Sequence, residues 1–277
     1  MDHNRQKKIA VINDLTGFGR CSLTVSIPII SKLRVQCCPV PTAVLSNHTA
    51  FPSCFFDDYT GNFEQYTGEW KKLNLSFSGI LTGYLGSVKQ FRLVESFIDE
   101  FKDKNTIVTI DPVMGDNGRA YHGFTEEMFR EMKKLIAHAD ILTPNLTEAC
   151  ILTDTEYHEK PWRMKELDEL IRKLSSMGPE KVVITGIPQG EFIANLCLDE
   201  GRIDKITRQY RIGDQRFGTG DIFASIIMAD AVNGVPFYDS VKRASRFVRR
   251  CILKTIEMDL PGTDGVAFEE VLDCLHA

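Results

Sequence analysis

The chain has 277 residues, of which 43% are hydrophobic and 26% are charged, a composition typical of a globular protein with a core of ordinary size. Its formal net charge of −5 argues against nucleic acid as the main partner, because no basic surplus exists to meet a phosphate backbone. Eight scattered cysteines without a CxxC pair, no signal-peptide pattern and no apolar run of membrane-spanning length predict a cytoplasmic protein with reduced thiols.

Short apolar runs predict buried strands along the whole chain. They fall, in chain order, at residues 8–13, 79–84, 106–112, 141–144 and 181–186, with a hairpin at 191–198 and 203–209. Residues 35–45 are rich in Val, Cys and Pro, which predicts irregular or edge strands in that segment.

Helices are predicted between these runs, where apolar residues recur at helical spacing. They cover residues 21–33, 88–101, 125–137, 165–177, 221–231, 237–255 and 268–275. Pro28 predicts a bend or a boundary in the first of them. Strands that alternate with helices predict an α/β fold whose parallel sheet is covered on both faces. Since no repeat or linker interrupts the pattern, we expect one domain over residues 1–277.

Polar and small residues cluster where the predicted strands end. These strand ends carry Asn13 and Asp14, Gly83 and Tyr84, Asp111, Thr143 to Asn145, and Thr185 with Gly186. Ligands of open α/β sheets bind outside the carboxyl ends of the strands. The sequence therefore predicts a binding crevice at this edge.

The segment Gly218-Thr219-Gly220-Asp221 precedes a helical pattern and is the strongest single signal. A glycine-rich turn at a helix N-terminus offers free N–H groups and the positive end of the helix dipole to an anion. A carboxylate at Asp221 would then be placed to accept a proton from a hydroxyl group. Such an arrangement is what phosphoryl transfer to an alcohol requires, although Asp is also a common helix-capping residue.

Other motifs have both a functional and a structural interpretation. Asp111 ends a strand, where a carboxylate can hold Mg²⁺ or cap a turn, and Asn145 with Glu148 has the spacing of a capping box. His48 is a candidate base, but a turn histidine with a structural hydrogen bond is the simpler interpretation. The turn at residues 17–22 nearly matches a dinucleotide fingerprint but lacks an acidic residue about twenty positions on, and the chain has no P-loop sequence.

Five segments together resemble the ribokinase superfamily and, within it, the pyridoxal kinases. They are Ser46-Asn47-His48-Thr49, Leu81-Thr82-Gly83-Tyr84, Asp111-Pro112-Val113-Met114-Gly115-Asp116, Thr143-Pro144-Asn145-Leu146-Thr147-Glu148-Ala149 and Gly218-Thr219-Gly220-Asp221. The resemblance implies a ribokinase-like three-layer α/β/α sandwich around a mostly parallel sheet. It also implies ATP-dependent phosphorylation of the 5′-hydroxymethyl group of pyridoxal, pyridoxine or pyridoxamine by a homodimer.

The resemblance also implies roles for individual residues. Asp221 would be the general base, and the N–H groups of Gly218, Thr219 and Gly220 would form an anion hole. Asp111 and Glu148 would hold Mg²⁺, with Asn145 beside them, and Thr185 would contact the triphosphate or a K⁺ ion. The turn with Asn117, Gly118, Arg119 and Tyr121 would cover ATP. Thr49 and Tyr84 would line the pyridine pocket.

One position departs from the family pattern. Pyridoxal kinases usually carry Ser-Ile-Gln-Ser in the first turn, whereas this chain has Val11-Ile12-Asn13-Asp14. Asp14 therefore stands where a serine contacts the substrate, and an ionised carboxylate accepts hydrogen bonds only. Hydroxymethylpyrimidine kinases carry an aspartate at a comparable position, so a kinase of thiamine synthesis is the main alternative. A sugar kinase lacks support because no long lid insertion follows the first strand, and a non-catalytic vitamer sensor would be expected to have lost Asp221 or the glycines.

Overall fold

Within the residues described in this computed structural model, 2–214 and 216–276, nine strands form one sheet in the order β11-β10-β9-β8-β5-β4-β1-β2-β3. The strands are β1 (Lys8–Phe18), β2 (Gln36–Asn47), β3 (Phe56–Asp58), β4 (Gly79–Thr82), β5 (Ile107–Ile110), β8 (Ile141–Leu142), β9 (Lys181–Gln189), β10 (Phe192–Asp199) and β11 (Arg202–Tyr210). Neighbours from β9 to β2 pair in parallel, while β10, β11 and β3 pair antiparallel. The prediction of a mostly parallel sheet is confirmed.

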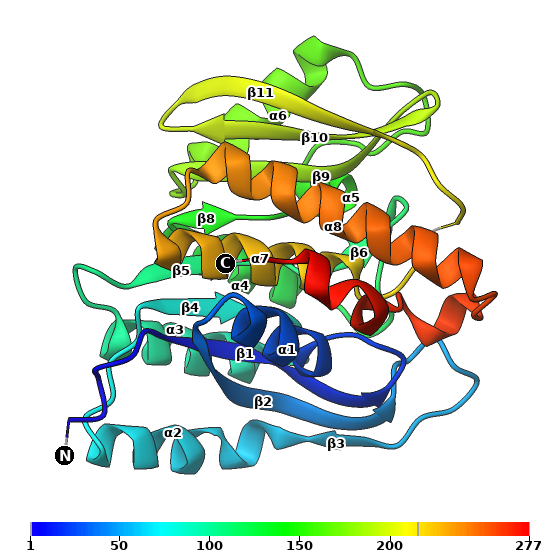
Figure 1. Ribbon diagram of the computed structural model, residues 1–277. Helices are drawn as coiled ribbons and strands as arrows, with labels where there is room; N and C mark the ends of the chain where they lie inside the picture. Colours follow the sequence, from blue (N-terminus) through cyan, green and yellow to red (C-terminus); the bar gives the residue numbers. More distant parts are fainter. Residues whose placement is uncertain (1, 215, 277) are drawn as a thin grey trace.

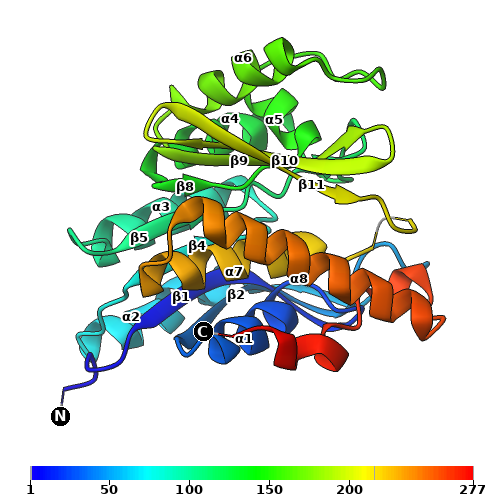
Figure 2. The ribbon, with the colours of Figure 1, turned by 45° about the horizontal axis from the view of Figure 1, so that its top comes forward.

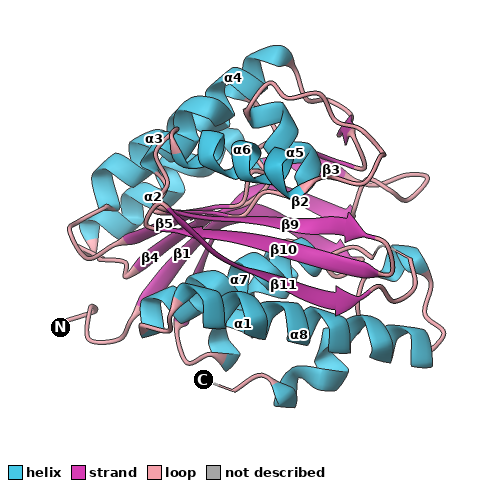
Figure 3. Ribbon diagram, turned by 90° about the horizontal axis from the view of Figure 1, so that it is seen from above, coloured by secondary structure: helices cyan, strands magenta, loops and turns pink. Residues whose placement is uncertain are grey.

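Helices cover both faces of the sheet (Figure 3). One face carries α1 (Leu23–Lys32), α7 (Thr219–Asn233) and α8 (Phe237–Glu257). The other carries α2 (Phe63–Lys72), α3 (Val88–Phe101), α4 (Glu126–Leu135), α5 (Leu146–Leu152) and α6 (Met164–Ser175). Each layer buries its own apolar cluster against the sheet, which gives the predicted three-layer α/β/α sandwich.

Short elements complete the chain. They are the 3-10 helices η1 (Tyr59–Asn62), η2 (Ile136–His138), η3 (Gly262–Asp264) and η4 (Phe268–Cys274), and the separate hairpin of β6 (Gly115–Asp116) and β7 (Arg119–Ala120). None of the helices that the structure describes is both long and apolar enough to cross a membrane.

Helix α7 is buried along most of its length because it lies between the sheet and α8 (Figures 1 and 2). Its apolar residues therefore occur on all sides, including Ile222, Phe223, Ile226 and Met228, which are at most 6% exposed. A helix that is hydrophobic all round is typical of such a sandwiched position. This packing fixes the N-terminus of α7 beside the carboxyl ends of the strands.

Four sequence-based expectations need correction. Pro28 lies inside α1 without ending it. Residues 36–47 form one continuous strand next to the edge, since β3 pairs with residues 43–45 of β2; the prolines at 39 and 41 lie outside that paired stretch and so tolerate a missing N–H group. The last predicted helix is the 3-10 helix η4. Helix α2 was not predicted because it buries only Phe63 and Thr67 and contains Gly68.

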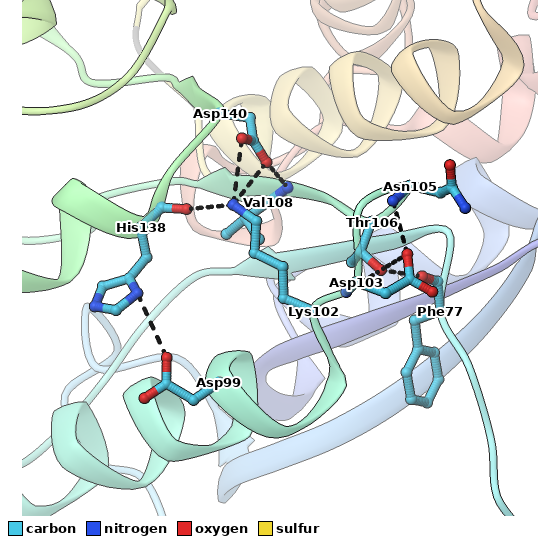
Figure 4. Close-up of polar contacts among 9 residues, drawn as sticks. All are labelled: Phe77, Asp99, Lys102, Asp103, Asn105, Thr106, Val108, His138 and Asp140. Atoms are coloured by element: carbon cyan, nitrogen blue, oxygen red, sulfur yellow. Dashed lines mark hydrogen bonds and ion pairs between the residues drawn. The ribbon is translucent and has the colours of Figure 1, made fainter.

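Polar contacts fasten the opposite, amino-terminal edge of the sheet (Figure 4). The carboxylate of Asp140, just before β8, accepts a hydrogen bond from the backbone N–H of Val108 at 2.7 Å and pairs with Lys102 at 3.2 Å. Lys102 also donates to the carbonyl of His138, whose ring pairs with acidic side chains of α3. These contacts join α3 to β5 and β8 and leave the carboxyl edge free for chemistry.

Candidate active site

The carboxyl ends of five parallel strands are joined by backbone hydrogen bonds just beyond the regular sheet. Gly83 donates to Ile12, Asp111 donates to Thr82, Thr143 donates to Ile110, and Thr185 donates to Pro144, at 2.8 to 3.2 Å. Polar residues of β1 and β9 and those that follow β4, β5 and β8 therefore form one continuous row. The N-terminus of α7 lies beside this row, since Asn13 of β1 donates to Asp221.

Gly218 sets the geometry at the start of α7. Its φ of 78° is left-handed, a region open to glycine, and a Cβ there would lie 2.1 Å from the carbonyl oxygen of Arg20. The loop thus approaches the turn after β1 more closely than any side chain would allow. The first-turn N–H groups, from Thr219 onward, have no partner within the helix, so they form a site for negative charge.

The carboxylate of Asp221 is held on two sides in the first turn of α7. The side-chain amide of Asn13 donates to its Oδ1 at 3.1 Å, and the backbone N–H of Ser22 donates to the same carboxylate. Burial, joined by the charge of Asp14, raises the pKa of Asp221 to about 6 despite these two donors. A carboxyl group with such a pKa is ionised at neutral pH and still basic enough to accept a proton.

Asp111 lies across from Gly220, since a Cβ on that glycine would come 4.0 Å from Oδ2 of Asp111. Its Oδ1 accepts a hydrogen bond from the hydroxyl of Thr143 at 2.9 Å. Burial and the charge of Asp221 raise the pKa of Asp111 to about 7. Two carboxylates therefore face the same small space at the start of α7.

Glu148 extends this acidic group toward α5. Its oxygens accept hydrogen bonds from the backbone N–H groups of Met114 at 3.2 Å and Asn145 at 2.8 Å. Burial, followed by the charge of Asp111, raises the pKa of Glu148 well above its ordinary value. The buried carboxyl groups of Asp111 and Glu148 and the half-buried one of Asp221 thus repel one another where a cation would relieve them.

The capping-box interpretation of Asn145 and Glu148 is correct, because both reciprocal bonds are present at the start of α5. It does not exclude a functional role, since the Nδ2 of Asn145 also donates to the carbonyl of Gly115 at 2.8 Å. Asn145 forms an isolated parallel bridge with Thr185 of β9. Two of the residues predicted to contact the nucleotide are therefore neighbours.

A tight hairpin covers the acidic residues. Asn117 and Gly118 both have positive φ values, 50° and 74°, and connect β6 to β7, as expected for a two-residue turn between antiparallel strands. Tyr121 follows, and burial together with the charges of Glu148, Asp116, Asp111 and Asp221 raises its pKa. Tyr121 is 43% exposed and Arg119, on β7, is exposed as well, so both side chains are open to solvent at this hairpin.

Asp14 faces inward. It is 6% exposed, and its two carboxylate oxygens accept hydrogen bonds from the hydroxyls of Thr16 at 2.5 Å and Ser22 at 2.7 Å. Burial raises the pKa of Asp14, and these hydroxyls oppose the shift. Since Ser22 also holds Asp221 through its backbone, Asp14 is linked to the carboxylate in the first turn of α7.

Two predicted pocket residues lie at different depths. Tyr84 follows β4, is half-buried, and packs edge-on against Phe124 with 6.1 Å between ring centres. Burial and the charge of Asp14 raise the pKa of Tyr84, and its backbone N–H donates to Asn13, the residue before Asp14. Thr49 is exposed on the turn that follows β2.

His48 has the structural role that was the simpler interpretation. Its Nε2 lies 2.7 Å from the carbonyl oxygen of Thr263, and its Nδ1 accepts from the N–H of Ala50 at 3.3 Å. A carbonyl only accepts, so Nε2 is the donor in this hydrogen bond. The ring also stacks on Phe217 at 4.1 Å, which supports the loop before Gly218.

The acidic residues fit a magnesium ion that takes only one or two of its ligands from the protein. Among the described residues, no group of three or more His, Cys, Asp or Glu side chains converges with the geometry of a metal site. Mg²⁺ usually keeps several waters and takes one or two carboxylates plus substrate phosphates. The repelling carboxyl groups of Asp111 and Glu148 match that pattern of donors.

Sequence reasoning missed Asn13 and Ser22 as site residues. Asn13 uses its Oδ1 to accept from the N–H groups of Asp14 at 3.0 Å and Tyr84 at 2.8 Å, and its Nδ2 holds Asp221. One amide thereby connects β1, β4 and α7. The only signal in the sequence was its position at the end of the first strand, because the partners lie 71 and 208 residues away.

Comparisons with known proteins give a consistent result. The family model described as phosphomethylpyrimidine kinase matches residues 69–263. A pyridoxine/pyridoxal/pyridoxamine kinase from Bordetella avium is 26% identical over 274 residues, which cover 92% of this chain and 89% of that protein.

Solved structures extend the similarity to the whole fold. A putative phosphomethylpyrimidine kinase from Bacteroides thetaiotaomicron, crystallised with pyridoxal, is 39% identical, has a TM-score of 0.92, and aligns over 98% of this chain and 96% of its own. Pyridoxal kinase from Lactobacillus plantarum is 27% identical with a TM-score of 0.89, again over 98% and 96% of the two chains.

Proposed function

We propose that this chain, which belongs to the phosphomethylpyrimidine kinase family, transfers a phosphoryl group from ATP to the 5′-hydroxymethyl group of pyridoxal, pyridoxine or pyridoxamine. One observation carries the proposal: the carboxylate of Asp221 lies in the first turn of a buried helix, beside free N–H groups at Gly218, Thr219 and Gly220. The pyridoxal bound by the relative from Bacteroides thetaiotaomicron supports the choice of substrate.

The chemistry follows from what each group can do at neutral pH. Asp221 accepts the proton of the substrate hydroxyl while the oxygen of that hydroxyl attacks the terminal phosphorus of ATP. The bond from this phosphorus to the oxygen that bridges it to the β-phosphate breaks, and ADP leaves. The N–H groups at the start of α7 hold the negative charge that develops on the transferred phosphoryl group. The protein does little covalent work in such a reaction, so positioning and charge neutralisation supply most of the catalysis.

Asp111 and Glu148 would hold Mg²⁺, directly or through water, and Asn145 and Thr185 would contact the nucleotide phosphates beside it. When bound, this ion neutralises charge on the phosphates and on the carboxylates. We also propose a site for K⁺, the monovalent cation, near Thr185. This residue lies where β9 makes its last parallel pair, with Asn145. Asn117, Arg119 and Tyr121 would cover the nucleotide from the hairpin.

The vitamer ring would lie against Tyr84, on the Asp14 side of the crevice, with Thr49 at its exposed rim. Phosphorylation of hydroxymethylpyrimidine in thiamine synthesis is the second candidate, because the family model carries that description and Asp14 replaces a serine. The relatives from Bordetella avium and Lactobacillus plantarum are both named as kinases of B6 vitamers, which favours the first candidate. We also propose that the protein works in the cytoplasm as a homodimer.

The test is ADP release with Mg-ATP and each of pyridoxal, pyridoxine, pyridoxamine and hydroxymethylpyrimidine, with Asp221→Ala as the matched control for contaminating kinases. We expect turnover with at least one B6 vitamer at a higher kcat/KM than with hydroxymethylpyrimidine. Turnover with hydroxymethylpyrimidine alone would reassign the substrate. Tight binding of ATP and vitamer with no ADP release would replace the kinase with a sensor.

A further inference from the structure

A second concave site lies on α8, on the outer face of the molecule. The hollow has a volume of about 340 Å³ and lies where η4 and the residues after it meet α8. Its lining residues are Asp239, Lys242, Arg243, Arg246, Phe247, Arg250, Cys274 and Leu275. Four of these eight are cations, in a chain whose net charge is −5.

Only two of the four cations in the hollow form ion pairs with acidic side chains. Arg243 pairs at 2.6 Å with Asp230, whose side chain is fully buried in α7, and Lys242 pairs at 3.4 Å with Asp239. Arg246 and Arg250 are exposed, and neither forms an ion pair or a side-chain hydrogen bond with the side chains that the structure describes, which exclude residues 1, 204, 205, 215 and 277. The hollow thus presents two guanidinium groups without an ion-pair partner among those side chains.

The cations of the hollow repel one another along α8. Lys242, Arg246 and Arg250 are spaced at i, i+4 and i+8, so each cation lies one turn from the next. Like charges at this spacing destabilise an isolated helix. An anion bound between them would reverse the sign of that interaction.

The shape and chemistry of the hollow indicate which anion it would take. Guanidinium groups match phosphate bidentately, and the volume lies at the small end of the range for ligand pockets. The one acidic lining residue, Asp239, is already matched by Lys242. We propose that the hollow binds the phosphate group of a small phosphorylated molecule, held by Arg246 and Arg250.

This site is separate from the catalytic centre. Asp230, which anchors Arg243, follows Asp221 on α7 by nine residues, a rise of about 14 Å along the helix. The N–H groups at the start of α7 and the carboxylates at the strand ends are therefore not part of the hollow. The proposal does not depend on the substrate assigned above.

Pyrophosphate binding, measured by calorimetry without Mg²⁺, tests the proposal in the intact protein. We compare the wild type with Arg246→Gln/Arg250→Gln and with Arg249→Gln, a matched control that removes a neighbouring cation of α8 outside the hollow. We expect the double variant to lose one class of binding sites or to bind about tenfold more weakly or worse, since it loses charge-assisted hydrogen bonds from both guanidinium groups. Arg249→Gln should keep wild-type binding.

ADP release by the double variant should remain at the wild-type level, which shows that the fold and the catalytic centre are intact. Unchanged pyrophosphate binding by that variant would overturn the proposal, and so would an equal loss in Arg249→Gln, which would indicate a general charge effect. Titration with pyridoxal 5′-phosphate and with ADP then distinguishes a product from a nucleotide as the source of the phosphate. In either case the binding attributed to the hollow must disappear in the double variant.

Discussion

The side-chain amide of Asn13 donates a hydrogen bond over 3.1 Å to the carboxylate of Asp221, which is 208 residues away in the sequence. The same amide accepts from the backbone of Tyr84. This residue of β1 thereby fixes both the carboxylate at the start of α7 and the turn after β4. The carboxylate that we propose as proton acceptor is thus positioned by one amide, and the kinetic consequences can be measured.

Replacement of Asp221 by Ala should remove the proposed proton acceptor and leave the binding surfaces in place. We expect kcat to fall by about 10²–10⁴-fold, the usual contribution of a general base, with a modest change in KM. Steady-state ADP release with pyridoxal measures both constants. Near-wild-type turnover in a clean preparation would remove Asp221 from this role.

The pH dependence of the wild type should show an acid limb set by the same carboxyl group. Its pKa is raised to about 6, and only the ionised form accepts a proton. The value of kcat/KM should therefore be constant above this pH and fall about tenfold per pH unit below it. ATP also ionises in this range, so the residual activity of Asp221→Ala serves as the control and should lack the limb.

Replacement of Asn13 by Ala should move that limb to higher pH. The amide donates to the ionised form of Asp221 and so lowers its pKa; without it the pKa rises. Loss of a hydrogen bond to a charged group, worth about 1.5–3 kcal/mol, should also lower kcat by about 10–100-fold at neutral pH. An unmoved limb, measured on the same substrate panel, would show that Asn13 does not act through Asp221.

The sequence predicted the sandwich and the strand ends because their signals are local. Buried parallel strands are continuous apolar runs, and the helices between them show a helical period, so most elements were placed within a few residues. Helix α2 was not predicted because only two of its residues, Phe63 and Thr67, are buried. The first strand was predicted too short, at residues 8–13 instead of Lys8–Phe18. Residues 14–18 are polar or exposed, and they pair with the separate strand β2.

The candidate site was predictable in outline and not in detail. Asp221, Asp111 and Glu148 could be named from motifs at predicted strand and helix ends, and the structure brings their carboxyl groups together. The roles of Asn13 and Ser22 depend on contacts across the fold, for which one sequence carries no pattern. The predicted roles of Thr49, Arg119 and Thr185 toward substrate or nucleotide remain predictions.

Asp111→Asn should stabilise the ligand-free protein at neutral and higher pH. The pKa of Asp111 is raised from 3.8 to about 7 in the fold, so the folded state holds its proton over a range in which the unfolded chain has released it. That contribution to stability is complete below pH 3.8 and is lost as the pH rises through 7. The neutral amide avoids the loss and still offers an oxygen to Thr143.

The free energy of unfolding in urea at pH 8 should therefore be higher for Asp111→Asn than for the wild type, by at least about 1 kcal/mol, and the two should converge near pH 4. The same substitution should lower kinase activity, since a carboxylate of the proposed Mg²⁺ site is lost. A variant that is less stable than the wild type at pH 8 would contradict the inferred repulsion among the buried carboxylates.

Replacement of Asp14 by Ser separates two roles for that residue. Both of its oxygens accept hydrogen bonds from the chain itself, from Thr16 and Ser22, and it is almost fully buried. We therefore expect kcat/KM to fall by a similar factor for pyridoxal, pyridoxine and pyridoxamine, because the displaced Ser22 no longer holds Asp221. Replacing a residue that contacts the substrate would instead change the ratios of kcat/KM among the three vitamers. A tenfold change in any of these ratios, about 1.4 kcal/mol, would show that Asp14 determines specificity.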